Sequence, residues 1–152
     1  PIELVVTGDG ELRGDLERRI ERTDHPERLH LLGFLEEREY VYKMMEEVDV
    51  YAMPSRWEGL CVAAIEAMAL RNACLFSEID AFYGPFHDVA RFHDVDDPSG
   101  LADRLIELAI DPEAREDLGK RARAEVEANY SLSVTAGAYV DVYRSVLVSR
   151  RR

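Results

Sequence analysis

The chain has 152 residues, of which 47% are hydrophobic, and a formal net charge of -12 from 31 acidic and 19 basic side chains. This composition suits one folded domain, and its negative field argues against a general binder of nucleic acid or anionic membranes. No apolar run approaches the roughly 18 residues of a membrane-spanning helix, and no signal peptide is visible, so we expect a cytoplasmic protein.

The basic residues are unevenly divided, since Lys43 and Lys120 are the lysines and all others are arginines. An acidic, arginine-rich surface fits a protein adapted to high salt, where self-repulsion is screened, and simple compositional bias would give the same pattern. Cys61 and Cys74 lie in apolar segments without metal-ligand spacing. We therefore expect two buried, reduced thiols.

Apolar periodicity and turn residues divide the chain into alternating strands and helices. Strands are predicted at residues 2–7, 28–34, 49–53 and 73–77, with one short strand near 89–92 inside a loop over 78–97. Helices are predicted at residues 11–22, 36–48, 60–70, 99–110, 113–129 and 131–148, and Arg150 to Arg152 are expected to fray from the last one.

Three of these helices carry specific expectations. The helix over 36–48 places Tyr40, Met44 and Val48 on one apolar face. The helix over 60–70 is apolar all round, which predicts burial on every side. Asp111 followed by Pro112 is typical of an N-cap and first residue, and predicts where the helix over 113–129 begins.

Strands that alternate with helices through short connections are typical of a parallel sheet covered on both faces. The strands are near-continuous apolar runs, as parallel strands buried on both sides should be. We therefore predict an α/β fold, a Rossmann-like parallel sheet with helices on both faces, in one domain over residues 1–152. The chain opens directly on a strand without a starting methionine, which we interpret as a piece of a longer chain.

Two glutamates bracket the apolar stretch that follows the strand at 49–53. Glu58 and Gly59 are expected at the start of the next helix, where free N–H groups favour an anion such as phosphate. Glu66 lies eight residues on, roughly 12 Å along the axis, which is too far for a glycosidase acid–base pair. A carboxylate on so apolar a helix needs hydrogen-bond donors, which either the protein or the hydroxyls of a ligand supply. For Glu58, a simple helix-dipole role is the alternative.

The segment Met53–Ala69, MPSRWEGLCVAAIEAMA, resembles the E-x7-E segment of retaining glycosyltransferases of the GT-B fold, the large group-4 type. LVVTGDGELRGDLERRI resembles the family's first strand with its G-x-G turn. LHLLGFLEEREYVYKMMEEVDVYAMPS and the segment from Asp94 to Ser131 resemble its later parts in the same order. The resemblance covers nearly the whole chain and implies the C-terminal, nucleotide-sugar-binding half of such an enzyme.

The resemblance also implies roles for the residues that match the motif. Glu58, the residue assigned to catalysis, would contact hydroxyls of the donor sugar, and Glu66 would hold the ribose. Amides around the helix start would hold the diphosphate, and backbone groups after the second strand would border the base. The donor-binding residues implied in this way are Glu66, Gly59, Leu60, Cys61, Ser55, Gly33, Phe34, Leu35, Gly8 and Gly10. No metal and no cofactor are implied, and the acidic Asp94-Val95-Asp96 is expected to be a loop.

The partners implied are a nucleotide-sugar donor and the N-terminal acceptor domain of the same chain, with a membrane surface as a further partner of the full enzyme. Nucleic acid is not among them. Without that domain we expect little or no activity. Arg71 and Ala73 stand where the family favours Gly and Pro, and IDAFYGPFHD replaces a glycine-rich loop. Arg56 and His87 are expected to be surface residues.

Two other interpretations remain. The altered loop favours a degenerate GT-B-like domain that serves as an interaction or regulatory module. A flavodoxin-like receiver would need an acidic cluster after the first strand and an aspartate after the third. Asp9 stands alone after the first strand, and Pro54-Ser55 follows the third, so the receiver fits poorly.

Overall fold

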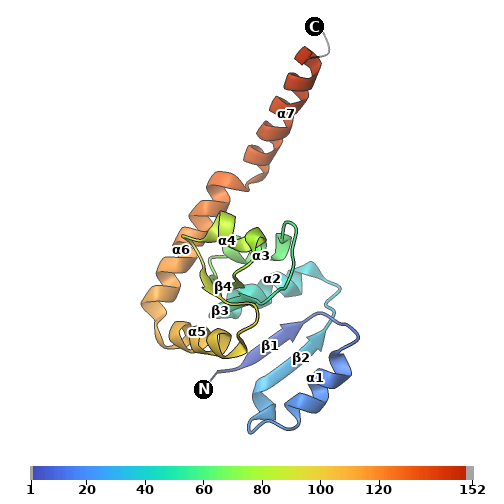
Figure 1. Cartoon of the computed structure of the whole chain (residues 1–152), viewed down its shortest axis with the longest axis vertical. Coiled ribbons are helices and arrows are strands. Elements are labelled where there is room, and N and C mark those ends of the chain that lie inside the picture. Colours follow the sequence, from blue (N-terminus) through green and yellow to red (C-terminus); the bar gives the residue numbers. More distant parts are fainter. Residues whose placement is uncertain (1, 150–152) are drawn as a thin grey trace. The chain divides into compact units, whose positions relative to one another are not determined.

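A computed structural model describes residues 2–149 of the chain (Figure 1). The backbone forms two compact units, one that ends at Met44 and one that begins at Met45, and each is described by itself. The predicted fraying of Arg150 to Arg152 lies outside the described residues. Within residues 2–149, no helix is both long and apolar enough to cross a membrane.

The amino-terminal unit is built on two parallel strands, β1 (Leu4–Thr7) and β2 (Leu29–Gly33). Helix α1 (Arg13–Ile20) and a short 3-10 turn (Pro26–Arg28) connect them. The predicted burial of the first strand is wrong, because all four residues of β1 are exposed. The reason lies in α1, whose eight residues are mostly charged and none of which is buried, so it offers little apolar surface.

Helix α2 (Arg38–Glu47) contains the sequence boundary between the units. Its one fully buried residue is Met45, whereas Tyr40, predicted on the apolar face, is 56% exposed. The other two residues of that predicted face, Met44 and Val48, are half-buried, so the prediction fails at Tyr40 alone.

The carboxyl-terminal unit is a three-stranded parallel sheet in the order β3-β4-β5. The strands are β3 (Val50–Met53), β4 (Ala73–Ser77) and β5 (Arg91–His93). The helices are α3 (Val62–Ala69), α4 (Asp80–Phe86), α5 (Pro98–Ile110), α6 (Pro112–Asn129) and α7 (Leu132–Ser149). The α/β class with parallel strands is confirmed.

The core of this unit forms around β4, whose five residues are all buried. On one face, Phe76 stacks on Phe82 of α4 with ring centroids 4.7 Å apart. On the other, Leu75 clusters with Leu108 of α5 and Leu118 of α6. Each such side chain contributes roughly 1.5–3 kcal/mol on burial. Helices on both faces of the sheet, as predicted, are therefore confirmed for β4.

The segment from 78 to 97 differs from its prediction as a loop. It contains α4 and places β5 at Arg91–His93, two residues later than expected. Gly84 and Pro85 disguise the helix in the sequence, and its stability comes from packing, since Phe82 and Phe86 both contact Phe76.

The helix starting at Pro112 begins as predicted. The side chain of Asp111 accepts a hydrogen bond of 2.9 Å from the amide of Ala114, which satisfies one of the first free N–H groups of α6. Further along α6, Gly119 is buried, and a Cβ added there would collide with the carbonyl oxygen of Arg71. Arg71 has a positive φ of 67° and ends the turn after α3.

Gly119→Ala should therefore lower the melting temperature. The collision with backbone costs roughly 1–3 kcal/mol or more, which exceeds the gain of about 1 kcal/mol in helix propensity. Gly137→Ala in α7 is the matched control, because its Cβ meets no atom within 4 Å and the substitution should leave or raise stability. A Gly119→Ala protein that melts with or above the wild type would contradict this packing.

Candidate functional site

The loop between β3 and α3, residues 54–61, lies at the carboxyl end of the sheet, where ligands bind in open α/β folds. Ser55 Oγ donates a 2.8 Å hydrogen bond to Oε1 of Glu58. Ser77, fully buried at the end of β4, donates its hydroxyl to the carbonyl of Ser55. The half-buried Glu58 carboxylate is thus held by a chain of two hydrogen bonds that begins in the core.

The loop leads into an α3 that has no side-chain cap. Cys61 is the N-cap residue and makes no capping hydrogen bond, although the amides of Ala63 and Ala64 lie near its sulfur, so an anion at the first turn of α3 would take these amides from the thiol. Burial raises the pKa of the Cys61 thiol, which favours its neutral form. Leu60 is exposed, and a Cβ at Gly59 would meet no atom within 4 Å, so the approach to these amides is open.

The helix start differs from the prediction. Glu58 and Gly59 were expected at the beginning of the helix, but α3 begins at Val62. Instead, Glu58 lies in the preceding loop and turns back onto Ser55. The separation of roughly 12 Å assumed a continuous helix, and that assumption does not hold between residues 58 and 61.

Helix α3 packs through one face, which corrects the expectation of burial on every side. Ala64, Ala67 and Met68 are buried, whereas Val62 is 56% exposed. Glu66 is half-buried in the second turn. An apolar composition alone does not bury a helix when only one of its sides meets other elements.

Tyr51, in the middle of β3, is a neighbour of this site that sequence reasoning missed. Burial raises the pKa of its phenol, and the charges of nearby groups, Glu66 and Glu58 among them, raise it further. The phenol therefore stays neutral at ordinary pH and keeps its proton as a hydrogen-bond donor. A tyrosine in a predicted strand carries no signal that separates it from a core residue.

The β5–α5 turn reaches the same loop through the ion pair of Arg56 with Asp96, 2.6 Å long. Both side chains are largely exposed, as expected for Arg56, so the pair contributes little to stability. The carboxylate of Asp94 accepts the amide of Asp96 at 2.8 Å, which confirms that 94–96 is a turn. His87 is exposed, with its Nε2 3.0 Å from Asp88.

The remaining predicted residues belong to the amino-terminal unit. Gly8 follows β1 and Gly33 is the last residue of β2, with positive φ values of 109° and 74°, and the amide of Gly8 donates to the carbonyl of Gly33 at 2.8 Å. Gly10 faces open space. Phe34 is 73% exposed and Leu35 is half-buried. The predicted residues therefore form two groups, one in each unit.

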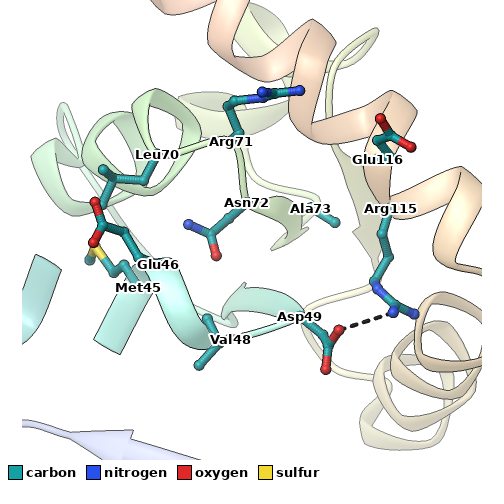
Figure 2. Close-up of a pocket in the computed structure, with 10 residues that line it drawn as sticks. All are labelled: Met45, Glu46, Val48, Asp49, Leu70, Arg71, Asn72, Ala73, Arg115 and Glu116. Atoms are coloured by element: carbon teal, nitrogen blue, oxygen red, sulfur yellow. Dashed lines mark ion pairs between the residues drawn. The ribbon is translucent and has the colours of Figure 1, made fainter. Parts of the chain in front are cut away.

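A cavity of about 170 Å³ lies at the opposite, amino end of β3 and β4 (Figure 2). The ion pair of Arg115 with Asp49, 2.9 Å long, closes one side of it, and Arg115 also donates to the last carbonyls of α5. Asn72, 4% exposed, donates to the carbonyl of Ala67. These contacts stabilise helix ends, so we assign this cavity to the architecture of the unit.

Comparisons with known proteins identify the family and the fold of the chain. Residues 1–125 match the family model of glycosyl transferases group 1. The chain is 27% identical over 150 residues to the alpha-D-kanosaminyltransferase of Streptomyces kanamyceticus, which covers 95% of this chain and 38% of that protein. It is 30% identical over 148 residues to the phosphatidyl-myo-inositol mannosyltransferase of Mycolicibacterium smegmatis, with coverages of 95% and 37%.

Among solved structures, Anabaena Alr3699/HepE in complex with UDP and glucose superposes with a TM-score of 0.85 at 15% identity, over 94% of this chain and 40% of that one. This likeness shows the fold, which is that of the GT-B glycosyltransferases. The chain spans about two fifths of the length of the curated relatives it matches. With a family model matched over residues 1–125, the chain belongs to the group 1 glycosyltransferases.

Proposed function

We propose that the chain binds a nucleotide-diphospho-sugar and is the donor-binding part of a retaining, metal-independent glycosyltransferase. The observation that carries this proposal is the anchored Glu58 carboxylate beside the uncapped start of α3, at the carboxyl end of a parallel sheet. A fixed hydroxyl acceptor and an anion site lie next to each other there, and a sugar diphosphate needs both.

Each group has a chemical task in this proposal. Glu58 accepts hydrogen bonds from hydroxyls of the donor sugar, and the Ser55 hydroxyl keeps its carboxylate oriented. The amides from Gly59 to Cys61 and the first turn of α3 stabilise the diphosphate as it leaves, without need of a metal ion. Glu66, half-buried in the second turn of α3, accepts the ribose hydroxyls.

Taken by itself, the amino-terminal unit has its own proposed contacts, in which backbone groups of Gly33, Phe34 and Leu35 border the base. The loop of Gly8 and Gly10 lies after β1 and has open space beside it. Both segments follow the carboxyl ends of parallel strands, as donor-binding segments of α/β folds do.

The comparisons suggest what to test and what the complete enzyme contains. Alr3699/HepE binds UDP and UDP-glucose in its crystal structures, which makes uridine nucleotides the first probes. The relatives are much longer than this chain, which supports an acceptor domain beside the donor domain. We further propose a cytoplasmic enzyme that works at a membrane surface, and one relative is named for phosphatidyl-myo-inositol, a membrane lipid, which supports the membrane part of this proposal.

One observation favours a second candidate, a degenerate domain without catalysis. In place of a glycine-rich loop, the segment after β4 forms α4, with Glu78 before it and Asp80 in its first turn. Two carboxylates at this edge would repel a diphosphate, whereas backbone amides would attract it. Binding of UDP by the wild-type chain separates the two candidates.

Glu66→Gln should weaken UDP binding roughly 10- to 100-fold in titration calorimetry, because a hydrogen bond to a charged group contributes about 1.5–3 kcal/mol. Glu113→Gln, an exposed carboxylate on α6, is the matched control and should bind as the wild type does. Equal affinity of the Glu66→Gln and wild-type proteins would remove Glu66 from the site.

Glu58→Gln should lower the affinity for the sugar part of the donor and leave the affinity for its nucleotide part nearly unchanged. The affinity for UDP should stay within about twofold, whereas the extra affinity for the UDP-sugar that the wild type prefers should fall roughly 10-fold or more. A loss of UDP affinity equal to the loss for the UDP-sugar would place Glu58 at the nucleotide instead.

A further inference from the structure

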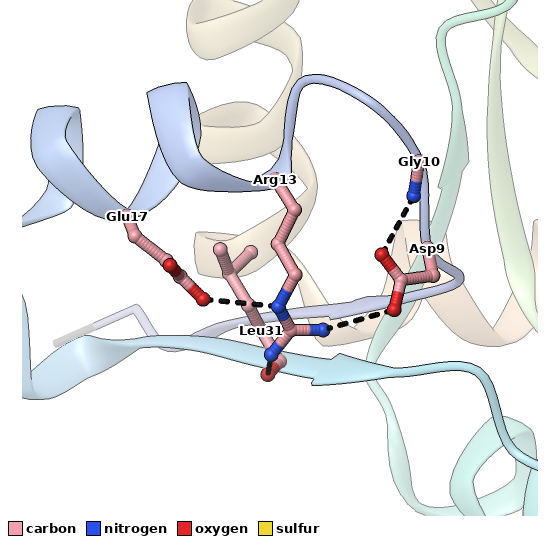
Figure 3. Close-up of polar contacts among 5 residues, drawn as sticks. All are labelled: Asp9, Gly10, Arg13, Glu17 and Leu31. Atoms are coloured by element: carbon pink, nitrogen blue, oxygen red, sulfur yellow. Dashed lines mark hydrogen bonds and ion pairs between the residues drawn. The ribbon is translucent and has the colours of Figure 1, made fainter.

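Arg13, in the first turn of α1, joins three parts of the amino-terminal unit (Figure 3). Its Nε donates to Oε1 of Glu17 at 2.9 Å, and its Nη2 donates to the carbonyl of Leu31 in β2 at 3.3 Å. Its Nη1 lies 3.7 Å from Oδ2 of Asp9. All three guanidinium nitrogens are therefore engaged, and they connect α1, β2 and the loop after β1.

The loop over residues 8–10 is built around this contact. Oδ1 of Asp9 accepts the amide of Gly10 at 2.7 Å, while its other oxygen faces Arg13. At the other end of the loop, the amide of Gly8 donates to the carbonyl of Gly33. The loop is thus held from both sides, which lowers the entropy lost when it contacts a ligand.

The guanidinium of Arg13 occupies the space that a side chain at position 33 would fill. A Cβ at this position would lie 2.8 Å from Nη1 of Arg13 and would displace the guanidinium. The positive φ of 74° favours glycine for a second reason. Conformation and space at the end of β2 are therefore both matched to the arginine.

Charge gives Arg13 a second effect. Asp9 lies in the loop that the proposed donor contacts, and the donor's diphosphate is anionic. Arg13 offsets the charge of Asp9, whereas an uncompensated carboxylate there would add to the repulsion from a chain of net charge -12.

We propose that Arg13 is a positioning residue for the donor site. It fixes the loop over residues 8–10 and offsets part of the negative charge of Asp9, so that the loop meets a nucleotide diphosphate with its amides in place and with less repulsion. This inference rests on the proposed function for its ligand, but its structural half is tested independently.

The first experiment measures amide hydrogen exchange by NMR on the 152-residue chain without ligand. Arg13→Gln should speed exchange of the Gly8 amide several-fold, because the loop loses one of its two attachments. Arg18→Gln is the matched control, since it removes the same charge from the same helix, where Arg18 pairs only with Asp15 among the described residues. Unchanged exchange in Arg13→Gln would overturn the positioning role.

The second experiment measures UDP affinity by calorimetry at low salt. Arg13→Gln should weaken binding roughly two- to fivefold, the size of one exposed charge interaction, and Arg18→Gln should not. Adding Asp9→Asn to Arg13→Gln should recover most of the affinity while fast exchange persists, which separates charge from positioning. Equal affinity of the Arg13→Gln and wild-type chains would overturn the link to the donor.

Two further outcomes are distinguishable. If the wild-type chain binds no UDP, the proposed uridine donor fails and the link of Arg13 to it fails too, while the exchange data still decide whether Arg13 fixes the loop. If Arg13→Gln does not fold, Arg13→Lys keeps the charge but cannot make the three guanidinium contacts to Glu17, Leu31 and Asp9. Gly8 exchange should then rise, and an unchanged rate would overturn the positioning role.

Discussion

The burial of β4 is the constraint on which the carboxyl-terminal unit depends. Its side chains point alternately into two apolar layers, one with Phe82 of α4 and one with Leu108 and Leu118 of α5 and α6. Because the strand is fixed from both sides, its last residue, Ser77, is fixed too. The hydroxyl of Ser77 then fixes the loop that carries Glu58, so the position of a surface carboxylate is decided by the packing of phenylalanine and leucine.

The net charge of the molecule repels its proposed ligand, and only groups close to the ligand attract it. A net charge of -12 repels a diphosphate at long range, and salt reduces this repulsion. In the carboxyl-terminal unit, the proposed binding then depends on short-range groups, the amides at the start of α3. Such an arrangement favours ligands that carry hydroxyls beside the phosphate, since the available carboxylates are hydrogen-bond acceptors.

Much of this architecture could be read from the sequence, and the failures have physical causes. The strand over 73–77 and the cap at Asp111 were predictable because apolar runs and N-cap residues act locally. Helix α4 was not, because Gly84 and Pro85 signal a turn and only the contact with Phe76 stabilises the helix. The return of Glu58 onto Ser55 was equally hidden, since it depends on where α3 begins rather than on composition.

In the candidate site too, some residues could be predicted from the sequence and others could not. Glu58 and Glu66 stand out because a carboxylate in an apolar segment is conspicuous in a sequence. Tyr51 and Ser77 do not, because each looks like an ordinary strand residue, and their relevance depends on which strand ends lie side by side. The spacing of residues identifies what a ligand would touch, whereas the groups that hold those residues in place become visible only in three dimensions.

In the loop between β3 and α3, the groups that attach the loop to the sheet are different from the side chains that the loop exposes. Ser77 holds it through a backbone carbonyl, which every residue type at position 55 would supply, and the side chains of Arg56, Trp57 and Leu60 point to solvent. Substitutions at these three positions would therefore change the exposed surface of the loop and leave its hydrogen bond with Ser77 intact. Under the proposed function, these three positions suit a combinatorial library for a change of donor sugar, with Ser55 and Ser77 left unchanged.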